Sequence, residues 1–363
     1  MNTANGHSPI QVGLPPLGSV WPTFGQPQKI ANSFFSESPN TSALLRPISI
    51  SPATFKATLD FQVPLTFVIG YVTTVMFLNR LNASRKFKPW AFSKTLPFRT
   101  LVVIHNASLA VFSAWALYGM CFSMHASWPA GATKDGPDYY AHIAQMFCEA
   151  DSTAIRAPAN VKSLWDEGSA YFGWFFYMSK FYEVLDTMII LSSGKKSSTL
   201  QTYHHAGVIL CAWVSLRYAS PSYVVSIVLN SAVHTLMYSY FALQTMGVSI
   251  PMAIKRSLTG IQIIQFLVGL IWIYVLVFLK YNIGSVLTGQ TNSNVSLSEL
   301  RQVHAAVGRD FCDGSNPFAA DVAVSCFADR GEAFPVLWST LYILPLLALF
   351  VRFFIRSYIK VRK

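Results

Sequence analysis

The stretch from residue 180 to residue 238 decides how this chain folds. It begins Lys180-Phe-Tyr-Glu183-Val-Leu-Asp186-Thr187, continues with Gln201-Thr-Tyr-His204-His205, and ends with Asn230-Ser-Ala-Val-His234-Thr-Leu-Met237-Tyr238. These charged, amide and imidazole side chains lie inside segments that are otherwise long apolar runs. Ionisable groups are costly in a bilayer and usually face the interior of a helix bundle, so they mark a candidate functional site.

The composition of the whole chain indicates a membrane protein. Its 363 residues are 52% hydrophobic and only 12% charged, and the mean hydropathy of +0.39 is far from that of an average soluble domain. Residues 1–60 are rich in Pro, Ser and Asn and lack the basic start and apolar block of a secretory signal peptide. We predict that they form a flexible luminal arm.

Seven segments approach the length of about 17 to 25 residues that a helix needs to cross a bilayer. They lie near Phe61–Leu78, Leu101–Ser123, Ala170–Leu191, Leu200–Tyr218, Tyr223–Leu243, Leu258–Tyr281 and Pro335–Tyr358. The third and fourth are the least hydrophobic, because they hold the polar stretch. We therefore predict an all-α membrane protein with one transmembrane domain over residues 61–358, luminal loops at 124–169 and 282–334, and a basic cytosolic tail at 359–363.

The distribution of charge in the connections predicts the orientation. The first, third and fifth connections and the tail are rich in Lys and Arg and contain no Asp or Glu. Every acid except Glu183 and Asp186 lies in the N-terminal arm or in the two luminal loops. An excess of Lys and Arg marks the cytosolic side, so the N-terminus is luminal and the C-terminus cytosolic. An odd number of crossings agrees with this.

Four glycosylation motifs fit the same orientation. Those at Asn40 and Asn294 fall on the predicted luminal side, where they could carry glycans. Those at Asn82 and Asn106 fall in a cytosolic connection and a membrane segment, where we expect no modification.

The five cysteines are too few for a disulfide scaffold and show no C-x-x-C spacing, so a zinc site is not indicated. Cys312 and Cys326 share the last luminal loop, and they either pair there or remain free thiols.

Lys180, Glu183 and Asp186 are spaced i, i+3, i+6 and would share one face of a helix. They either form a buried ion pair that fixes helix packing or line the wall of a reaction chamber. Three ionisable groups in one membrane helix are an expensive packing device, so we favour the reaction chamber.

The next two segments carry more groups of the same kind. On the fourth lie Gln201, His204 and His205, and on the fifth lie Asn230, His234 and Tyr238. A lone membrane histidine could merely bridge two helices through a hydrogen bond. Three histidines with two amides and a tyrosine indicate proton handling, nucleophilic catalysis or metal binding.

Thr259, Gln262 and Gln265 open the sixth segment, again near its cytosolic end. Glutamines one turn apart either join helices by hydrogen bonds or bind substrate, and the sequence leaves both readings open.

Together these motifs resemble the successive signatures of the ELO-type fatty-acid elongases. The resemblance rests on Lys180-x-x-Glu183-x-x-Asp186-Thr187, the box ending in His204-His205, His234-x-x-Met237-Tyr238, and Thr259-x-x-Gln262-x-x-Gln265-Phe266. It covers roughly residues 55–363. The long last luminal loop and the Cys326-Phe-Ala segment are most similar to fungal members. This chain departs from the family pattern at one position. The family's box is usually His-x-x-His-His, whereas here Gln201 replaces its first histidine.

The resemblance implies a very-long-chain 3-oxoacyl-CoA synthase of the endoplasmic reticulum membrane, a class that supplies sphingolipid precursors. Such an enzyme condenses a long-chain acyl-CoA with malonyl-CoA, releases CO2 and CoA, and needs no cofactor. The implied fold has seven transmembrane helices, six of them forming a barrel around an acyl-chain tunnel. The implied partners are membrane lipids and the ketoreductase, dehydratase and enoyl reductase of the elongation cycle. A homodimer is compatible with this, and no nucleic acid is expected.

The resemblance also implies roles for individual residues. In this family an imidazole takes the acyl group, and the positions implicated match His204 and His234, which gives a reactive acyl donor. The candidate catalytic residues are His204, His205, His234, Lys180, Glu183 and Asp186. The candidate substrate-binding residues are Gln201, Asn230, Tyr238, Thr259, Gln262 and Gln265, with Lys195, Lys196, Lys255 and Arg256 for the phosphates of CoA. These four basic residues could equally reflect topology and attraction to anionic lipid.

Two other classes of protein compete with this reading. A di-iron lipid desaturase or hydroxylase also carries histidine boxes, since imidazole suits iron. Such enzymes spend most of eight histidines on their metals, whereas this chain has eight in total and leaves a core of three. The others are His7, His125, His142 and His304 in the arm or luminal loops, and His105 in the second segment. A seven-helix receptor or transporter would account for the helices but not for the four signatures.

Overall fold

The computed structural model describes residues 10–22, 46–128, 139–148, 164–282, 323–327 and 331–359. The helices are α2 (Pro52–Thr58), α3 (Gln62–Ser84), α4 (Leu96–Ala126), α5 (Tyr139–Cys148), α6 (Ala170–Glu183), α7 (Leu185–Ser192), α8 (Thr199–Arg217), α9 (Pro221–Met246), α10 (Met252–Phe278) and α13 (Phe334–Phe354). Short helical turns are η1 (Leu17–Val20), η2 (Ala91–Lys94), η3 (Trp165–Ser169) and η4 (Ile355–Ile359). The strands β1 (Ile10–Val12), β2 (Leu279–Asn282) and β3 (Ala323–Ser325) form one antiparallel sheet in the order β1-β2-β3.

All seven predicted membrane segments fall largely on helix, with two differences. The sixth was predicted to reach Tyr281, but α10 ends at Phe278 because the following residues pair as β2 with both β1 and β3. The third is interrupted at Val184, which separates α6 from α7. The small sheet and this interruption depend on tertiary contacts, and the hydrophobic pattern carries no signal for either.

Five helices in the described part of the chain are long and apolar enough to cross a membrane. They are α3, α4, α9, α10 and the run from Phe334 to Ile359. The α6–α7 pair and α8 are not among them. These are the two segments that carry the polar stretch, which lowers their hydropathy. The count of seven crossings therefore stays a prediction.

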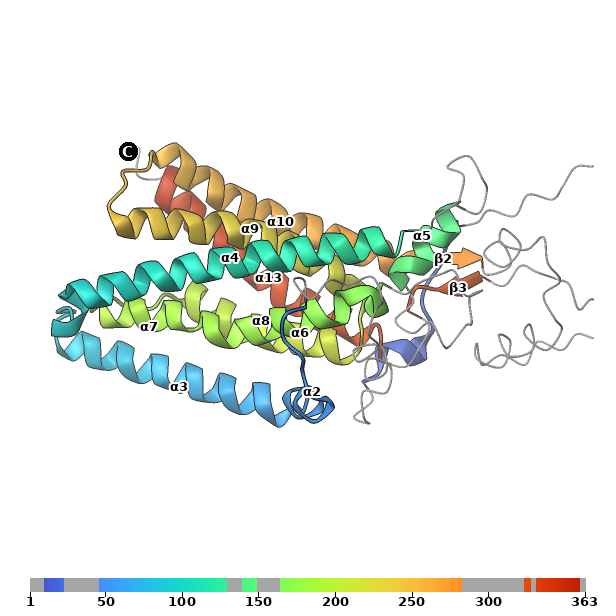
Figure 1. The fold of residues 1–363 in the computed structure, drawn as a ribbon, viewed down its shortest axis with the longest axis horizontal. Coiled ribbons are helices and arrows are strands. Elements are labelled where there is room, and N and C mark those ends of the chain that lie inside the picture. The colour runs from blue at the N-terminus through green and yellow to red at the C-terminus, as the bar shows by residue number, and fades with distance from the viewer. Residues whose placement is uncertain are drawn as a thin grey trace, which may run out of the picture.

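The long helices run along one axis, and their connections separate into two ends (Figure 1). The α3–α4 and α9–α10 connections and the C-terminus lie at one end, whereas α5, β2 and β3 lie at the other. The first end thus gathers the basic connections that contain no Asp or Glu. This sidedness agrees with the predicted topology, and the assignment of that end to the cytosol stays a prediction.

Contacts between helices follow a closed order. Helix α4 packs on α9, α9 on α10, α10 on α13, α13 on α8, α8 on α6, and α6 back on α4. Helix α3 contacts α7 and α8 from outside this set. The six-helix barrel stays a prediction, and this order of contacts supports it.

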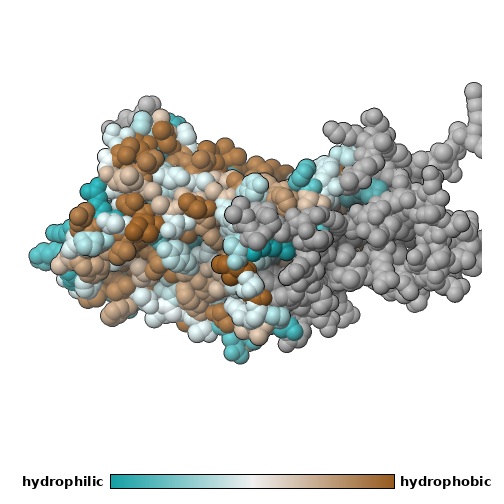
Figure 2. Space-filling model, in the orientation of Figure 1, coloured by the Kyte–Doolittle hydropathy of each residue, from teal (hydrophilic) through white to brown (hydrophobic). Residues whose placement is uncertain are grey.

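Helix α6 lies at the centre of the core. Ten of its fourteen residues are buried, and a run of aromatic side chains packs around it, with Trp115 of α4 meeting the ring of Phe172 edge to face at 5.0 Å. By contrast, α10 exposes most of its apolar side chains, including Ile264 and Ile271. Figure 2 shows apolar side chains spread over the face of the helical region. An apolar exterior of this kind suits contact with lipid.

Parts of the predicted N-terminal arm have structure. Strand β1 pairs with β2, and α2 buries Phe55 against the helical core. Tyr177 donates a hydrogen bond to the Thr58 carbonyl oxygen at 3.0 Å, so the end of α2 is fixed to α6.

Cys326 pairs with Cys148 of α5 in a disulfide, not with Cys312. The sequence suggested Cys312 because both residues belong to one loop, whereas α5 and β3 both lie beside β2 and bring residues 178 positions apart together. Cys312 itself lies outside the described residues, as do the glycosylation motifs at Asn40 and Asn294.

Asn82 and Asn106 are both buried. Asn82 lies within α3 and not in the predicted connection, because that helix continues to Ser84. The Asn82 amide donates to the Leu191 carbonyl oxygen at 2.8 Å, and its own oxygen accepts from the Trp90 indole at 3.1 Å. The residue therefore ties α3 to the end of α7.

Candidate active site

Lys180 and Glu183 form a buried ion pair at the end of α6. The Lys180 Nζ lies 2.7 Å from Glu183 Oε1, and both side chains are 2% exposed. The ammonium also donates to Asn230 Oδ1 of α9 at 3.1 Å, and it sits over the Phe176 ring. Since Ser179 donates to the same carboxylate at 3.1 Å, the two buried charges are hydrogen-bonded as well as paired.

The second oxygen of Glu183 faces His234. Glu183 Oε2 lies 3.8 Å from His234 Nδ1, and neither atom has a hydrogen-bond partner among the described residues. A carboxylate at this distance stabilises positive charge on an imidazole. The pair can therefore accommodate a proton or a cationic intermediate during a reaction.

Asp186 does not join the Lys180–Glu183 face that its spacing predicted. Asp186 Oδ1 lies 2.8 Å from His105 Nε2 of α4, and Tyr238 of α9 donates to Oδ2 at 2.7 Å. The prediction of one shared face for all three ionisable residues was therefore wrong. The backbone keeps helical dihedral angles at Val184, and positions i and i+6 of a helix lie about 120° apart around its axis, so the spacing itself places Asp186 away from Lys180.

The box on α8 begins at the helix N-cap, where Ser198 accepts a hydrogen bond from the Gln201 backbone N–H at 3.1 Å. The Gln201 side-chain amide lies 2.8 Å from His205 Nε2. Because this nitrogen accepts from the amide, the other ring nitrogen of His205 carries the proton. Gln201 thus orients one of the two histidines.

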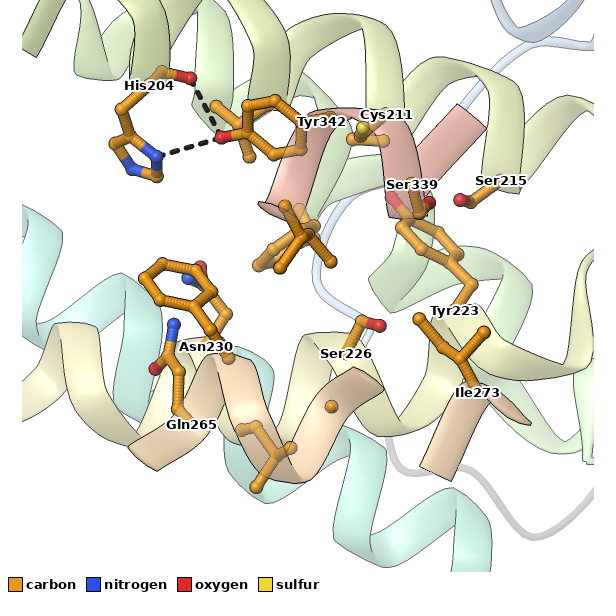
Figure 3. Close-up of a pocket in the computed structure, with 17 residues that line it drawn as sticks. His204, Cys211, Ser215, Tyr223, Ser226, Asn230, Gln265, Ile273, Ser339 and Tyr342 are labelled. Atoms are coloured by element: carbon orange, nitrogen blue, oxygen red, sulfur yellow. Dashed lines mark hydrogen bonds between the residues drawn. The ribbon is translucent and has the colours of Figure 1, made fainter. Parts of the chain in front are cut away.

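His204 points the other way, toward α13. Its Nδ1 lies 2.9 Å from the hydroxyl of Tyr342, and the two residues meet at one end of a cavity of about 100 Å³ (Figure 3). Asn230 and Gln265 line the cavity near His204, whereas Ser215, Tyr223 and Ile273 line its other end. The cavity thus runs from the histidine and two amides to an end where hydroxyl groups and apolar side chains both line the wall.

Of the sixth segment's motif, Gln265 and Phe266 line this cavity. Thr259 is buried, and its hydroxyl lies 3.2 Å from that of Tyr358 in η4. Gln262 donates to the Met237 sulfur at 3.2 Å. These two side chains join helices, while Gln265 Oε1 has no hydrogen-bond partner in the described part of the chain.

The four basic candidates lie apart from the cavity. All of them are exposed at the basic end of the helices, Lys195 and Lys196 between α7 and α8, and Lys255 and Arg256 near the start of α10. None of them lines the described cavity. A role in binding CoA would therefore concern the entrance of the site.

Two residues of the site were missed or set aside in the sequence analysis. His105 was placed outside the histidine core, although a histidine in a membrane segment is itself a signal. Tyr342 belongs to an apolar run without any motif, so no pattern could have found it. Among the residues that the structure describes, no group of three or more His, Cys, Asp or Glu side chains is arranged to hold a metal ion.

Residues 57–363 match the ELO family, described as the GNS1/SUR4 family. The chain belongs to this family. Over 220 residues it is 30% identical to "Long chain fatty acid elongase 2" of Caenorhabditis elegans, which covers 60% of this chain and 70% of that protein. It is 29% identical over 211 residues to "Fatty acid elongase 2" of Trypanosoma brucei brucei, covering 56% of this chain and 72% of the other. A third relative is "Very long chain fatty acid elongase 6" of Drosophila melanogaster. It is 28% identical over 212 residues, which cover 58% of this chain and 61% of that protein.

The ELO family match includes every helix that contributes to the site. It begins within α2 and continues through α13 to the end of the chain. The buried ion pair, the histidine box and the cavity thus all lie in the part of the molecule that defines the family.

Proposed function

We propose that this ELO-family protein condenses a long-chain acyl-CoA with malonyl-CoA to give a 3-oxoacyl-CoA two carbons longer. The observation that carries the proposal is the position of His204. Its imidazole lies at one end of a mostly apolar cavity, where an acyl chain can extend away from it. The family membership and the names of the relatives support the same reaction class.

In the first half-reaction, His204 Nε2 attacks the thioester carbonyl of the acyl-CoA, the C–S bond breaks, and CoA leaves as the thiolate. The acyl group is then held as an acyl-imidazolium, which is a reactive donor. The Glu183 carboxylate, the anion of the buried pair with Lys180, can balance the positive charge. His234 lies beside the same carboxylate but does not line the described cavity.

In the second half-reaction, malonyl-CoA loses CO2 and the resulting enolate carbon attacks the acyl carbon. The C–N bond breaks, and His204 returns to its neutral form. The cation on the ring and the enolate cancel, so no proton has to move within the site. Asn230 lines the cavity, and its amide N–H groups and the Lys180 ammonium can stabilise the enolate oxygen.

The described cavity is smaller than a long acyl chain, since about 100 Å³ is the space of only a few water molecules. Substrate binding therefore requires the lining side chains to move apart. Phe266 and Ile343 lie on the cavity wall and belong to different helices, α10 and α13. A shift of either side chain would widen the cavity without breaking a hydrogen bond.

The same proposal places the protein in the endoplasmic reticulum membrane, with the basic connections in the cytosol. The disulfide between Cys148 and Cys326 lies at the opposite end of the molecule, which suits an oxidising lumen. The product would pass to a ketoreductase, a dehydratase and an enoyl reductase, since a 3-oxo group must be removed before another cycle.

The test is condensation by the purified protein. Long-chain acyl-CoA and labelled malonyl-CoA should yield labelled CO2 and a 3-oxoacyl-CoA. His204→Ala should abolish both products, whereas His125→Ala, an exposed histidine at the end of α4, should retain them. Malonyl-CoA that stays intact with the parent protein and a range of acyl-CoA lengths would refute the proposed reaction. Iron in the purified protein would point instead to a di-iron enzyme.

A further inference from the structure

Tyr342 makes two contacts with His204 through a single hydroxyl group. Its oxygen lies 2.9 Å from His204 Nδ1 and donates to the His204 backbone carbonyl oxygen at 3.1 Å. Both contacts cross from α13 to α8 and are drawn as dashed lines in Figure 3. The described residues offer His204 no other hydrogen-bond partner for its side chain.

Counting hydrogens at this contact links the tautomer of the imidazole to the direction in which the Tyr342 hydroxyl donates. A tyrosine hydroxyl carries one hydrogen, and a carbonyl oxygen can only accept. If the Tyr342 hydrogen goes to the His204 carbonyl, the hydroxyl oxygen must accept from Nδ1–H. A neutral imidazole has one N–H, so Nε2 is then left with its lone pair.

The opposite tautomer fits the surroundings less well. It would place the N–H on Nε2, which has no acceptor among the described residues. An N–H at Nε2 would therefore gain no hydrogen bond from these residues. The ring edge away from Tyr342 is turned toward Asn230 and Gln265 on the cavity wall. An unprotonated Nε2 there has the lone pair that attack on a carbonyl requires.

Two neighbours on α8 hold Tyr342 in this place. The Tyr203 ring stacks on the Tyr342 ring with centroids 5.6 Å apart, and its hydroxyl donates to the Tyr342 carbonyl oxygen at 3.2 Å. Gly207 lies under the same ring, where a Cβ atom would overlap the Tyr342 ring carbons. The close approach of α13 to the histidine therefore requires a glycine at this position.

We propose that Tyr342 is a positioning residue that holds His204 as the Nδ1–H tautomer and so presents Nε2 to the cavity as the nucleophile. The proposal rests on the proposed function for its consequence in catalysis. The tautomer itself is a property of the resting protein. It can therefore be measured without any substrate.

The first test is the 15N spectrum of the full-length protein with labelled histidine, with His204 assigned as the signals lost in His204→Ala. The parent should show a protonated Nδ1 and an unprotonated Nε2 for this residue. Tyr342→Phe keeps the ring but removes the hydroxyl, so the Nε2–H form should become populated. A protonated Nε2 in the parent, or an unchanged tautomer in Tyr342→Phe, would overturn the proposal.

The second test is the rate at which labelled acyl-CoA alone acylates the protein. Tyr342→Phe should slow acylation about tenfold or more, a factor of ten being about 1.4 kcal/mol, with little change in the KM for acyl-CoA. An acylation rate equal to that of the parent would also overturn the proposal. If the spectra are as expected but labelled acyl-CoA does not acylate even the parent protein, the tautomer assignment stands. The proposed function would then be refuted.

Gly207→Ala provides a second variant, because the added methyl group displaces the Tyr342 ring without changing the hydroxyl. It should reproduce both the spectral change and the slower acylation. Gly260→Ala is the matched control, since a Cβ atom there meets nothing within 4 Å. Equal acylation rates for the two alanine variants would contradict the proposed role of the ring position.

Discussion

Replacing Lys180 by Met removes the cation from a buried ion pair and leaves its partner charge in place. Glu183 is 2% exposed and lies 2.7 Å from the ammonium, so it would keep only the hydrogen bond from Ser179. Removing one partner of a buried pair typically costs about 3 to 5 kcal/mol. Lys180→Met should therefore lower the free energy of unfolding by about this amount.

The double variant Lys180→Met with Glu183→Gln removes both charges and should recover most of that stability. An uncharged amide needs no cation, and its oxygen can still accept from Ser179. The order of thermal unfolding temperatures in detergent should be parent, then double variant, then single variant. Condensation should remain low in both variants, because Asn230 loses its Lys180 donor and the carboxylate is unpaired or gone.

The control is Lys56→Met, which removes an exposed lysine near the end of α2 and should leave the unfolding temperature close to that of the parent. A double variant as unstable as Lys180→Met would refute the reasoning, because the loss would then not come from an unpaired carboxylate. The same holds for a single variant as stable as the parent.

Three further predictions concern the box, the entrance and the far end of the cavity. The condensation rate of Gln201→His should stay within about tenfold of the parent's, a difference of about 1.4 kcal/mol in the activation barrier. The reason is that an imidazole can replace the amide that contacts His205. A parent protein without condensation activity that becomes active through this change alone would contradict an orienting role for Gln201. The pair Lys255→Gln and Arg256→Gln should raise the KM for acyl-CoA or malonyl-CoA, since both residues are exposed at the basic end; unchanged KM values for both substrates would exclude them from the CoA site. Tyr223→Ala should shift products to longer chains, because this ring lines the end of the cavity away from His204; an unaltered chain-length profile would show that the acyl chain does not reach it.

The sequence predicted the helical segments and most of the candidate site because both leave regular signals. Long apolar runs set the helices, and ionisable groups inside them stand out from their surroundings. Lys180, Glu183 and Asn230 indeed meet in one buried cluster. The hydrogen bond from Gln201 to His205 follows from helical spacing alone.

The structure differs from these predictions where contacts between distant segments decide the outcome. Asp186 contacts His105 of α4 and Tyr238 of α9 instead of joining the Lys180–Glu183 pair. Cys148 became the partner of Cys326 because α5 and β3 both lie beside β2. Tyr342 contacts His204 across 138 positions of sequence, and a tyrosine in an apolar helix gives no signal of such a role.

The covalent step is the central claim, and incubation with labelled acyl-CoA in the absence of malonyl-CoA tests it most directly. Release of CoA and stable label on the protein, with the acyl mass on the peptide that contains His204, is the predicted result. The label should disappear in His204→Ala and persist in His125→Ala. Condensation that proceeds normally with malonyl-CoA, but with no release of CoA and no label before malonyl-CoA is added, would contradict the covalent route.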